Sequence, residues 1–304
     1  MTSNKKMLLL FRSKKCLPAL LAILLAVYIT GCGNEKDKTE YTSDIRIEAS
    51  TAFYPMAETI MEHIYESANT DGQTVKPVAI SDGQIVTPVA TSAGFADLSS
   101  GNADLLISSI PNDQQQKLLN QSGREYEYIP LITEPLVILV NKNNPVDSVS
   151  MEQLRSMYRE NALNWSEYGG NDLSVTTYQL EEGNGSQTAF SRYVNCMKEE
   201  ENHREIQTMN AIIDAVAADE SGICYAFSSY YFRGYPGMNA KVVQVDGKDF
   251  DEPGYPLTCA VSAYFCKDNR NPELRRIVEF LQSEEGRESA EENGILNSRK
   301  FRAK

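Results

Sequence analysis

Short loops that carry hydroxyl and amide side chains recur along this chain at the ends of strand-like runs, and three of them open helical patterns. A helix that starts in such a loop leaves free backbone N–H groups at its positive dipole end, where an anion can bind. Each loop alone is a weak signal. Their β/α alternation is typical of an open α/β sheet, in which ligands bind beyond the carboxyl ends of the strands. The loops are Ser50-Thr51-Ala52-Phe53, Thr91-Ser92-Ala93-Gly94, Ser108-Ser109 and Gly183-Asn184-Gly185-Ser186.

The last of these loops has the clearest local pattern. Val175 to Leu180 is a β-branched and apolar run, which predicts a strand. Gly183 to Ser186 breaks that pattern, and apolar residues then follow at helical spacing from Ala189. The pattern predicts an anion site at the start of this helix; an ordinary capped helix after a tight turn is the alternative.

The N-terminus indicates export. Basic residues precede Leu17 to Ile29, an apolar run that is short for a membrane-spanning helix. The run closes on Ile29-Thr30-Gly31-Cys32, which resembles the bacterial lipobox. We therefore expect residues 1–31 to be a lipoprotein signal peptide, Cys32 to be lipidated, and the polar residues 32–43 to form a flexible tether. A plain signal peptide and a short anchor helix are the alternatives. The expected location is the extracytoplasmic face of a bacterial membrane.

The charge of the chain limits its partners. Removing residues 1–31 takes away five positive side chains and no negative one, which changes the formal net charge from −13 to −18. A nucleic acid or an anionic lipid surface would need a basic face, so neither is expected as a partner. A small anion is still possible, because backbone dipoles can bind one inside an acidic protein.

The cysteines and histidines offer little for catalysis or metal binding. No C-x-x-C pair occurs and the chain has only two histidines, so we expect no metal site and no cofactor. G-x-S-x-G and H-E-x-x-H motifs are absent, which argues against an enzyme. Disulfides and buried free thiols both remain open for Cys196, Cys224, Cys259 and Cys266.

The order of these segments resembles the phosphate-binding lipoproteins of ABC importers, within the periplasmic-binding-protein-like type II superfamily. Ala49 to Pro55 looks like the first ligand loop of that family, and Thr91 to Phe95 is similar to the second. Val137 to Pro145, Glu152 to Leu154 and Asn164 to Gly170 resemble its crossover strand, the helix after it and its Asn-Trp-Ser turn.

This resemblance implies an α/β, two-lobed fold, with each lobe a mixed sheet flanked by helices and two strands crossing at the hinge. Residues 44–134 and 259–304 would form one lobe and residues 135–258 the other. Closure would bring hydroxyl groups of the first lobe against the 184–186 loop of the second, around an oxyanion. The implied ligand-binding residues are Ser50, Thr51, Ala52, Phe53, Thr91, Ser92, Ser108, Ser109, Asn184, Gly185 and Ser186.

The chain departs from the family pattern at residues that would lie next to the anion. Family members usually have an arginine where this chain has Leu180, a glycine where it has Ala90 and, in some, an aspartate where it has Ser109. Without the guanidinium, three helix N-termini of ~+0.5 charge each would face a dianion of −2. A proton on phosphate would need an acceptor, for which Ser109, Glu181 and Glu182 are candidates, whereas sulfate would need none.

Two functions follow from the resemblance. The first is a monomeric, membrane-anchored solute-binding lipoprotein that captures a small oxyanion, most simply phosphate, and delivers it to an ABC permease. Sulfate, molybdate and tungstate are the other candidate anions. The second is a non-transport sensor or adhesion lipoprotein on the same scaffold, with altered or lost ligand binding; Leu180 favours it.

Overall fold

The computed structural model describes residues 41–43, 45–70, 75–77, 85–159, 163–194, 203–235 and 238–293. These residues belong to one compact unit, Glu40–Lys304. The predicted signal peptide and the predicted lipidation site at Cys32 lie outside the described residues. Within the described ranges, no helix is long and apolar enough to cross a membrane.

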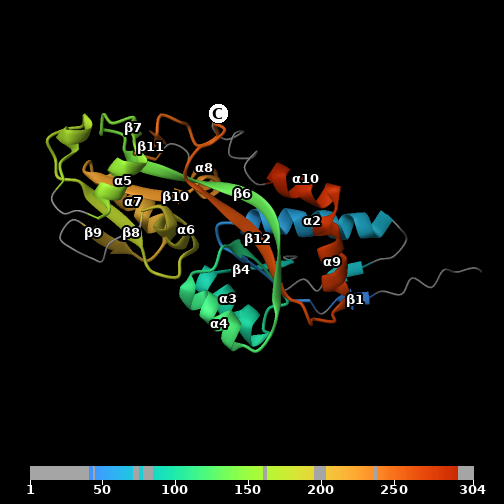
Figure 1. Cartoon of the computed structure of the whole chain (residues 1–304). Helices are drawn as coiled ribbons and strands as arrows, with labels where there is room; N and C mark the ends of the chain where they lie inside the picture. The colour runs from blue at the N-terminus through green and yellow to red at the C-terminus, as the bar shows by residue number, and fades with distance from the viewer. Residues whose placement is uncertain are drawn as a thin grey trace, which may run out of the picture. The chain divides into compact units, whose positions relative to one another are not determined.

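Strands and helices alternate along the chain, as the loop pattern predicts (Figure 1). The first part comprises β1 (Tyr41–Ser43), β2 (Ile47–Ser50), α2 (Tyr54–Thr70), β3 (Val75–Pro77), β4 (Val86–Val89), α3 (Thr91–Ser100), β5 (Leu105–Ser109), α4 (Asp113–Gln121) and β6 (Tyr126–Asn141). The middle part comprises β7 (Ser148–Val149), α5 (Met151–Met157), the 3₁₀ helix η1 (Trp165–Tyr168), β8 (Thr176–Leu180), α6 (Gly185–Val194), β9 (His203–Ile206), α7 (Met209–Ala218), β10 (Gly222–Phe227), α8 (Ser228–Gly234) and β11 (Ala240–Val245). The last part comprises β12 (Thr258–Cys266), α9 (Pro272–Gln282) and α10 (Glu284–Asn293).

Most described strands join one mixed sheet of ten strands, with the order β4-β2-β5-β12-β6-β10-β8-β9 and with β11 and β7 branching from β6. Strands β4, β2 and β5 are parallel, and so are β10, β8 and β9. Antiparallel β12 and β6 lie between these two groups. The predicted α/β fold class, with a mixed sheet flanked by helices, is confirmed.

The long strand β6 connects the two groups (Figure 1). Its first part, Tyr126 to Pro135, pairs with β12, and its second part, Leu136 to Val140, pairs with β10. Leu136 to Val140 is a branched apolar run and is fully buried, as expected of a strand covered on both faces. The lobe boundaries expected from the sequence, 134/135 and 258/259, fall inside β6 and at the start of β12.

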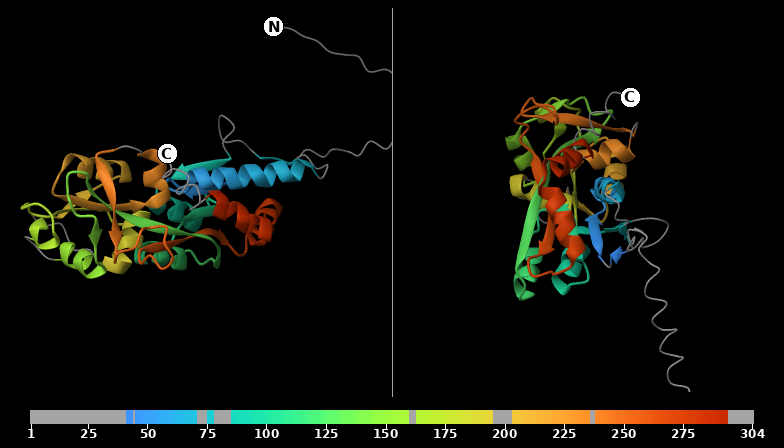
Figure 2. Two further views of the ribbon diagram at one scale, coloured as in Figure 1. Left: turned by 90° about the horizontal axis from the view of Figure 1, so that it is seen from above. Right: turned by 90° about the vertical axis from the view of Figure 1, so that its right-hand side faces the viewer.

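The helices follow local signals. The Ser-x-x-Gln spacing of Ser150 and Gln153 predicts a capping box, which these residues form at the start of α5, and Asn271 caps α9, which begins at Pro272. A glycine at position 101 predicts the end of the preceding helix, and α3 does end there, with a Gly101 φ of 80° in the left-handed region that favours glycine. Helix α10 packs against α2 and α9 (Figure 2).

Two segments differ from the sequence-based expectation. Residues Tyr41–Ser43 were expected to belong to the flexible tether, but they form β1, which pairs in parallel with β3. Backbone pairing needs no apolar side chain, so the polar composition of the tether gave no sign of it. Ile206 fits the apolar stripe of the following helix by spacing, yet it ends β9 and α7 starts at Met209.

The buried core explains Trp165 and three of the cysteines. Trp165 is fully buried and its Nε1 donates to Ser221 O at 2.7 Å, so it anchors the packing of its turn, as a sole tryptophan within a turn sequence predicts. Cys224, Cys259 and Cys266 are buried free thiols, and burial raises the pKa of Cys259 to about 11. Cys196 lies outside the described residues.

Candidate anion-binding site

Three of the predicted hydroxyl side chains form a buried cluster. Ser50 ends β2 and Ser108 lies on the adjacent strand β5, where their Oγ atoms are 2.7 Å apart. Thr91 Oγ1, at the start of α3, donates to Ser50 Oγ at 3.1 Å. All three residues are at most 9% exposed. The carboxyl ends of neighbouring parallel strands thus gather these hydroxyls at one edge of the sheet, as expected for an open α/β sheet.

The hydroxyl of Ser109 extends this cluster towards the other side of the cleft. Ser109 is fully buried, yet its Oγ has no hydrogen-bond partner among the described residues. A Cβ atom built on Gly185 would lie 2.5 Å from Ser109 Oγ and 2.9 Å from Thr91 Oγ1. Ser109 at the end of β5 and Thr91 at the start of α3 therefore lie so close to the N-terminus of α6 that no side-chain atom fits between them and Gly185.

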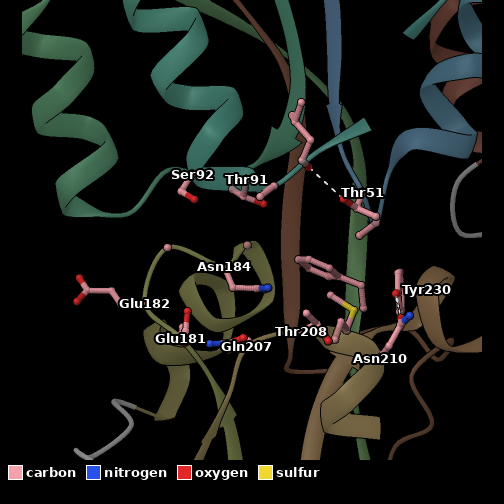
Figure 3. A pocket seen from close by; sticks show the side chains of 17 residues that line it. Thr51, Thr91, Ser92, Glu181, Glu182, Asn184, Gln207, Thr208, Asn210 and Tyr230 are labelled. Atoms are coloured by element: carbon pink, nitrogen blue, oxygen red, sulfur yellow. Dashed lines mark hydrogen bonds between the residues drawn. The ribbon is translucent and has the colours of Figure 1, made fainter. Parts of the chain in front are cut away.

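Asn184 organises the N-terminus of α6. Its Oδ1 accepts hydrogen bonds from both Ser186 N and Ser186 Oγ at 3.0 Å, so the Ser186 hydroxyl is held within its own loop. Asn184 is the side chain of this loop that lies in the gap below Thr91 (Figure 3). The sequence grouped Asn184 with Ser186 as donors to one anion; in the structure Asn184 faces the cleft and Ser186 is fully buried behind it.

A cavity of about 430 Å³ lies between the two sets of loops (Figure 3). Helices α3, α6 and α7 all direct their N-terminal residues to it. Helix α3 has no side-chain cap on its N-terminus, because Ala90 precedes it. Six of the predicted site residues line the cavity: Thr51, Ala52, Thr91, Ser92, Asn184 and Gly185. The other five, Ser50, Phe53, Ser108, Ser109 and Ser186, are buried behind that lining.

The helix entrance of α7 was missed by the sequence reasoning. Thr208 caps α7, with its Oγ1 accepting from Ala211 N at 3.2 Å, and follows directly after strand β9. That is the same order of strand, hydroxyl-bearing loop and helix that the other loops show, so the signal was present at Thr208. The predicted helix stripe that began at Ile206 obscured it. The lining residues that the sequence reasoning missed are Val89, Gln207, Thr208, Met209, Asn210, Phe227 and Tyr230.

The charge around the cavity is negative. Its described lining includes Glu181 and Glu182 and no lysine or arginine. Leu180, which replaces the family arginine, is 1% exposed and packs in the core, while its N–H donates to Tyr225 Oη at 3.0 Å. The positive potential available to an anion here is therefore that of N–H groups at helix ends. No cluster of three or more His, Cys, Asp or Glu side chains suited to a metal ion occurs within the described ranges.

One buried carboxyl group binds the start of α8. Glu134 Oε1, on β6, accepts from Ser229 N at 2.7 Å and from Ser228 Oγ at 2.9 Å, at the start of α8. Complete burial raises the pKa of Glu134 above its usual range, and the hydrogen bonds and Arg233 oppose that shift. Glu134 thus ties the strand that crosses the cleft to α8, whose Tyr230 lines the cavity.

Gln115 links the two sides of the cleft directly. Its Nε2 donates to Gly183 O at 3.0 Å, and its Oε1 completes the capping box of α4 with Asn112. We expect Gln115→Met to weaken ligand binding about three- to tenfold, because one net hydrogen bond between the two sides contributes ~0.5–1.5 kcal/mol to closure. Isothermal titration calorimetry measures this loss.

The control is Gln153→Met, which removes the equivalent capping glutamine of α5, a helix that does not line the cavity. Both variants should lose similar stability, and only Gln115→Met should lose affinity. Equal affinities of the two variants would show that the contact between Gln115 and Gly183 plays no part in binding.

The fold and the cleft between two sheet regions define the class of protein. A family model described as the PBP superfamily domain matches residues 35–285. The chain therefore belongs to the PBP superfamily, and the resemblance inferred from its sequence is confirmed.

Particular relatives are phosphate receptors. The phosphate-binding protein PstS of Staphylococcus saprophyticus is 25% identical over 219 residues, which cover 67% of each chain. A candidate phosphate ABC transporter substrate-binding protein from Clostridium perfringens, solved with bound phosphate, superposes with a TM-score of 0.63 at 22% identity, covering 83% of this chain and 98% of the other. An ABC-type phosphate transport receptor from Vibrio cholerae gives a TM-score of 0.59 at 21% identity, with coverage of 83% and 98%.

Proposed function

We propose that this protein is a membrane-anchored solute-binding lipoprotein that captures a small oxyanion, most simply phosphate, for an ABC importer. It acts as a monomer by hinge closure, with residues 44–134 and 259–304 as one lobe and residues 135–258 as the other. The anion stabilises the closed form because it contacts both lobes at once. The protein binds and delivers its ligand; it does not transform it.

The buried Ser109 hydroxyl is the observation that carries this proposal. A buried hydroxyl without a partner costs stability, so its retention needs a reason. Ser109 lies beside Thr91 and faces the N-terminus of α6 at Gly185. When the cleft opens by a few ångströms, an oxyanion between these groups would accept hydrogen bonds from the Ser109 hydroxyl and from helix N–H groups, whereas the Thr91 hydroxyl already donates to Ser50 Oγ.

The named relatives support phosphate as the first ligand to test, since all three are described as phosphate-binding or phosphate-transport proteins. The lipid anchor is proposed from Ile29-Thr30-Gly31-Cys32 and places the protein at the extracytoplasmic face of the membrane. Its delivery partner is the permease of the importer.

The second candidate is a non-transport sensor or adhesion lipoprotein whose ligand binding is altered or lost. Two observations favour it: Leu180 is buried in the core where relatives of the resembled family have arginine, and the described cavity lining carries acidic but no basic side chains. Neutral donors and helix ends bind an anion less tightly than a guanidinium does.

A ligand screen distinguishes these candidates. Purified full-length protein is titrated with phosphate, sulfate, molybdate and tungstate while its melting temperature is recorded, and each hit is measured by calorimetry. We expect phosphate to raise the melting temperature, since a ligand at 100 times its Kd stabilises the folded state by ~2.7 kcal/mol. An unchanged melting temperature with all four anions would contradict the importer function and favour the second candidate.

A further inference from the structure

The cavity extends well beyond the space that an inorganic oxyanion needs. A water molecule takes up about 30 Å³, so a five-atom oxyanion fills roughly 60–90 Å³, whereas the cavity holds about 430 Å³. That volume lies in the range of about 300–1,000 Å³ that is typical of sites for small organic ligands. The additional space is bordered by the β9–α7 junction and by α8, which contribute Thr208, Asn210 and Tyr230 (Figure 3).

This second part of the cavity has a distinct chemistry. Tyr230 Oη donates to Asn210 Oδ1, so the two side chains hold each other in place on the cavity wall. Phe227 and Met209 add apolar surface next to them. Polar side chains alternating with apolar ones suit an organic group with a short carbon chain and a polar end.

A carboxylate lies in the same wall. Leu180 on β8 pairs with Ile206 on β9, and Glu181 N donates to Ile206 O at 3.2 Å. This pairing places Glu181 beside Gln207, as Figure 3 shows, whereas Glu182 extends away from the labelled cluster. The described cavity lining has no lysine or arginine to neutralise Glu181.

Two parts of the cavity lining therefore favour opposite charges. Near Gly185, an anion is favoured by helix N–H groups and by the buried Ser109 hydroxyl, which has no partner within the described part of the chain. Near Gln207, Glu181 favours a cation and disfavours a second anionic group. We infer that the ligand of this cavity is zwitterionic: a small phosphorylated amino alcohol or an aminoalkyl phosphonate, with its phosphoryl group at Gly185 and its ammonium group at Glu181. This inference rests on the proposed oxyanion site and specifies the compound that carries the oxyanion.

The test compares phosphoethanolamine with ethyl phosphate, which is similar in size but lacks the ammonium group, and with inorganic phosphate. Calorimetry on the full-length protein should show phosphoethanolamine binding at least about tenfold more tightly than ethyl phosphate. In Glu181→Gln that preference should fall to about threefold or less. In the matched control Glu205→Gln, which removes an exposed carboxylate of β9 that does not line the cavity, it should persist, and thermal melts of both variants confirm that they are folded.

The outcomes separate this inference from the proposed function. Equal affinities for phosphoethanolamine and ethyl phosphate, with phosphate still bound, would overturn the inference that the ligand is zwitterionic. The proposed function as an oxyanion receptor would then still stand. A preference that survives Glu181→Gln unchanged would overturn the role of Glu181. Failure of all three compounds to bind would overturn both the inference and the receptor.

Discussion

Gly185→Ala should lower phosphate affinity about 100-fold, which corresponds to ~2.7 kcal/mol, while the protein remains folded. The reason is steric. The added methyl carbon would lie 2.5 Å from Ser109 Oγ and 2.9 Å from Thr91 Oγ1, both closer than real Cβ contacts, so it would take up the space between these groups that the proposed oxyanion needs when the cleft opens. Calorimetry gives the affinity, and small-angle scattering with and without phosphate reports closure.

The effect should come from the contact and not from the backbone. Gly185 does not have a positive φ, so alanine suits its conformation at the first turn of α6. Gly234→Ala is the matched control, because nothing lies within 4 Å of its added Cβ and its φ is not positive either. Normal phosphate affinity in Gly185→Ala would mean that the anion does not bind between Gly185 and these two hydroxyls.

Ser109→Ala should change stability and affinity in opposite directions. The Ser109 hydroxyl is buried and has no partner among the described residues, so its removal should raise the free energy of unfolding by about 1 kcal/mol. If the hydroxyl donates to the bound anion, the same change should weaken phosphate binding about 10- to 100-fold, since a hydrogen bond to a charged group contributes ~1.5–3 kcal/mol. Urea unfolding and calorimetry measure the two quantities.

The neighbouring residue supplies the control for this prediction. Ser108 Oγ is paired with Ser50 Oγ at 2.7 Å, so Ser108→Ala removes one buried hydrogen bond, leaves Thr91 as the remaining partner of the Ser50 hydroxyl and should lower stability by about 1 kcal/mol. If Ser109→Ala also lowered stability and kept full affinity, Ser109 would be a packing residue and the site would have to lie elsewhere in the cleft.

Much of the local structure was predictable from the sequence. The capping box at Ser150, the Pro272 start of α9 and the Gly101 end of α3 are all decided by residues within one turn of each other. The α/β class likewise follows from the alternation of β-branched runs and helical stripes. The exceptions were Ile206, where an apolar residue suited both a strand end and a helix stripe, and Tyr41–Ser43, where a polar segment pairs through its backbone alone.

The site was predictable only in part, for a physical reason. The loops at Ser50, Thr91 and Gly185 were identifiable because a strand, a hydroxyl-bearing loop and a helix are consecutive in the chain. The direction in which each side chain points was not identifiable from the sequence. Ser186 donates to Asn184 within its own loop, and Leu180 packs in the core among residues that are distant in the sequence, so the order of residue types alone does not give either direction.

The sequence by itself determined which segments become strands and helices, and that several helices begin in donor-rich loops, because these features depend on neighbours a few residues away. Only the tertiary structure decided that Ser109 and Thr91 meet Gly185, and that Glu181 lies beside Gln207 in the same cavity wall. Those contacts depend on the pairing of β6 with both β12 and β10, which joins loops far apart in the chain and has no local signature.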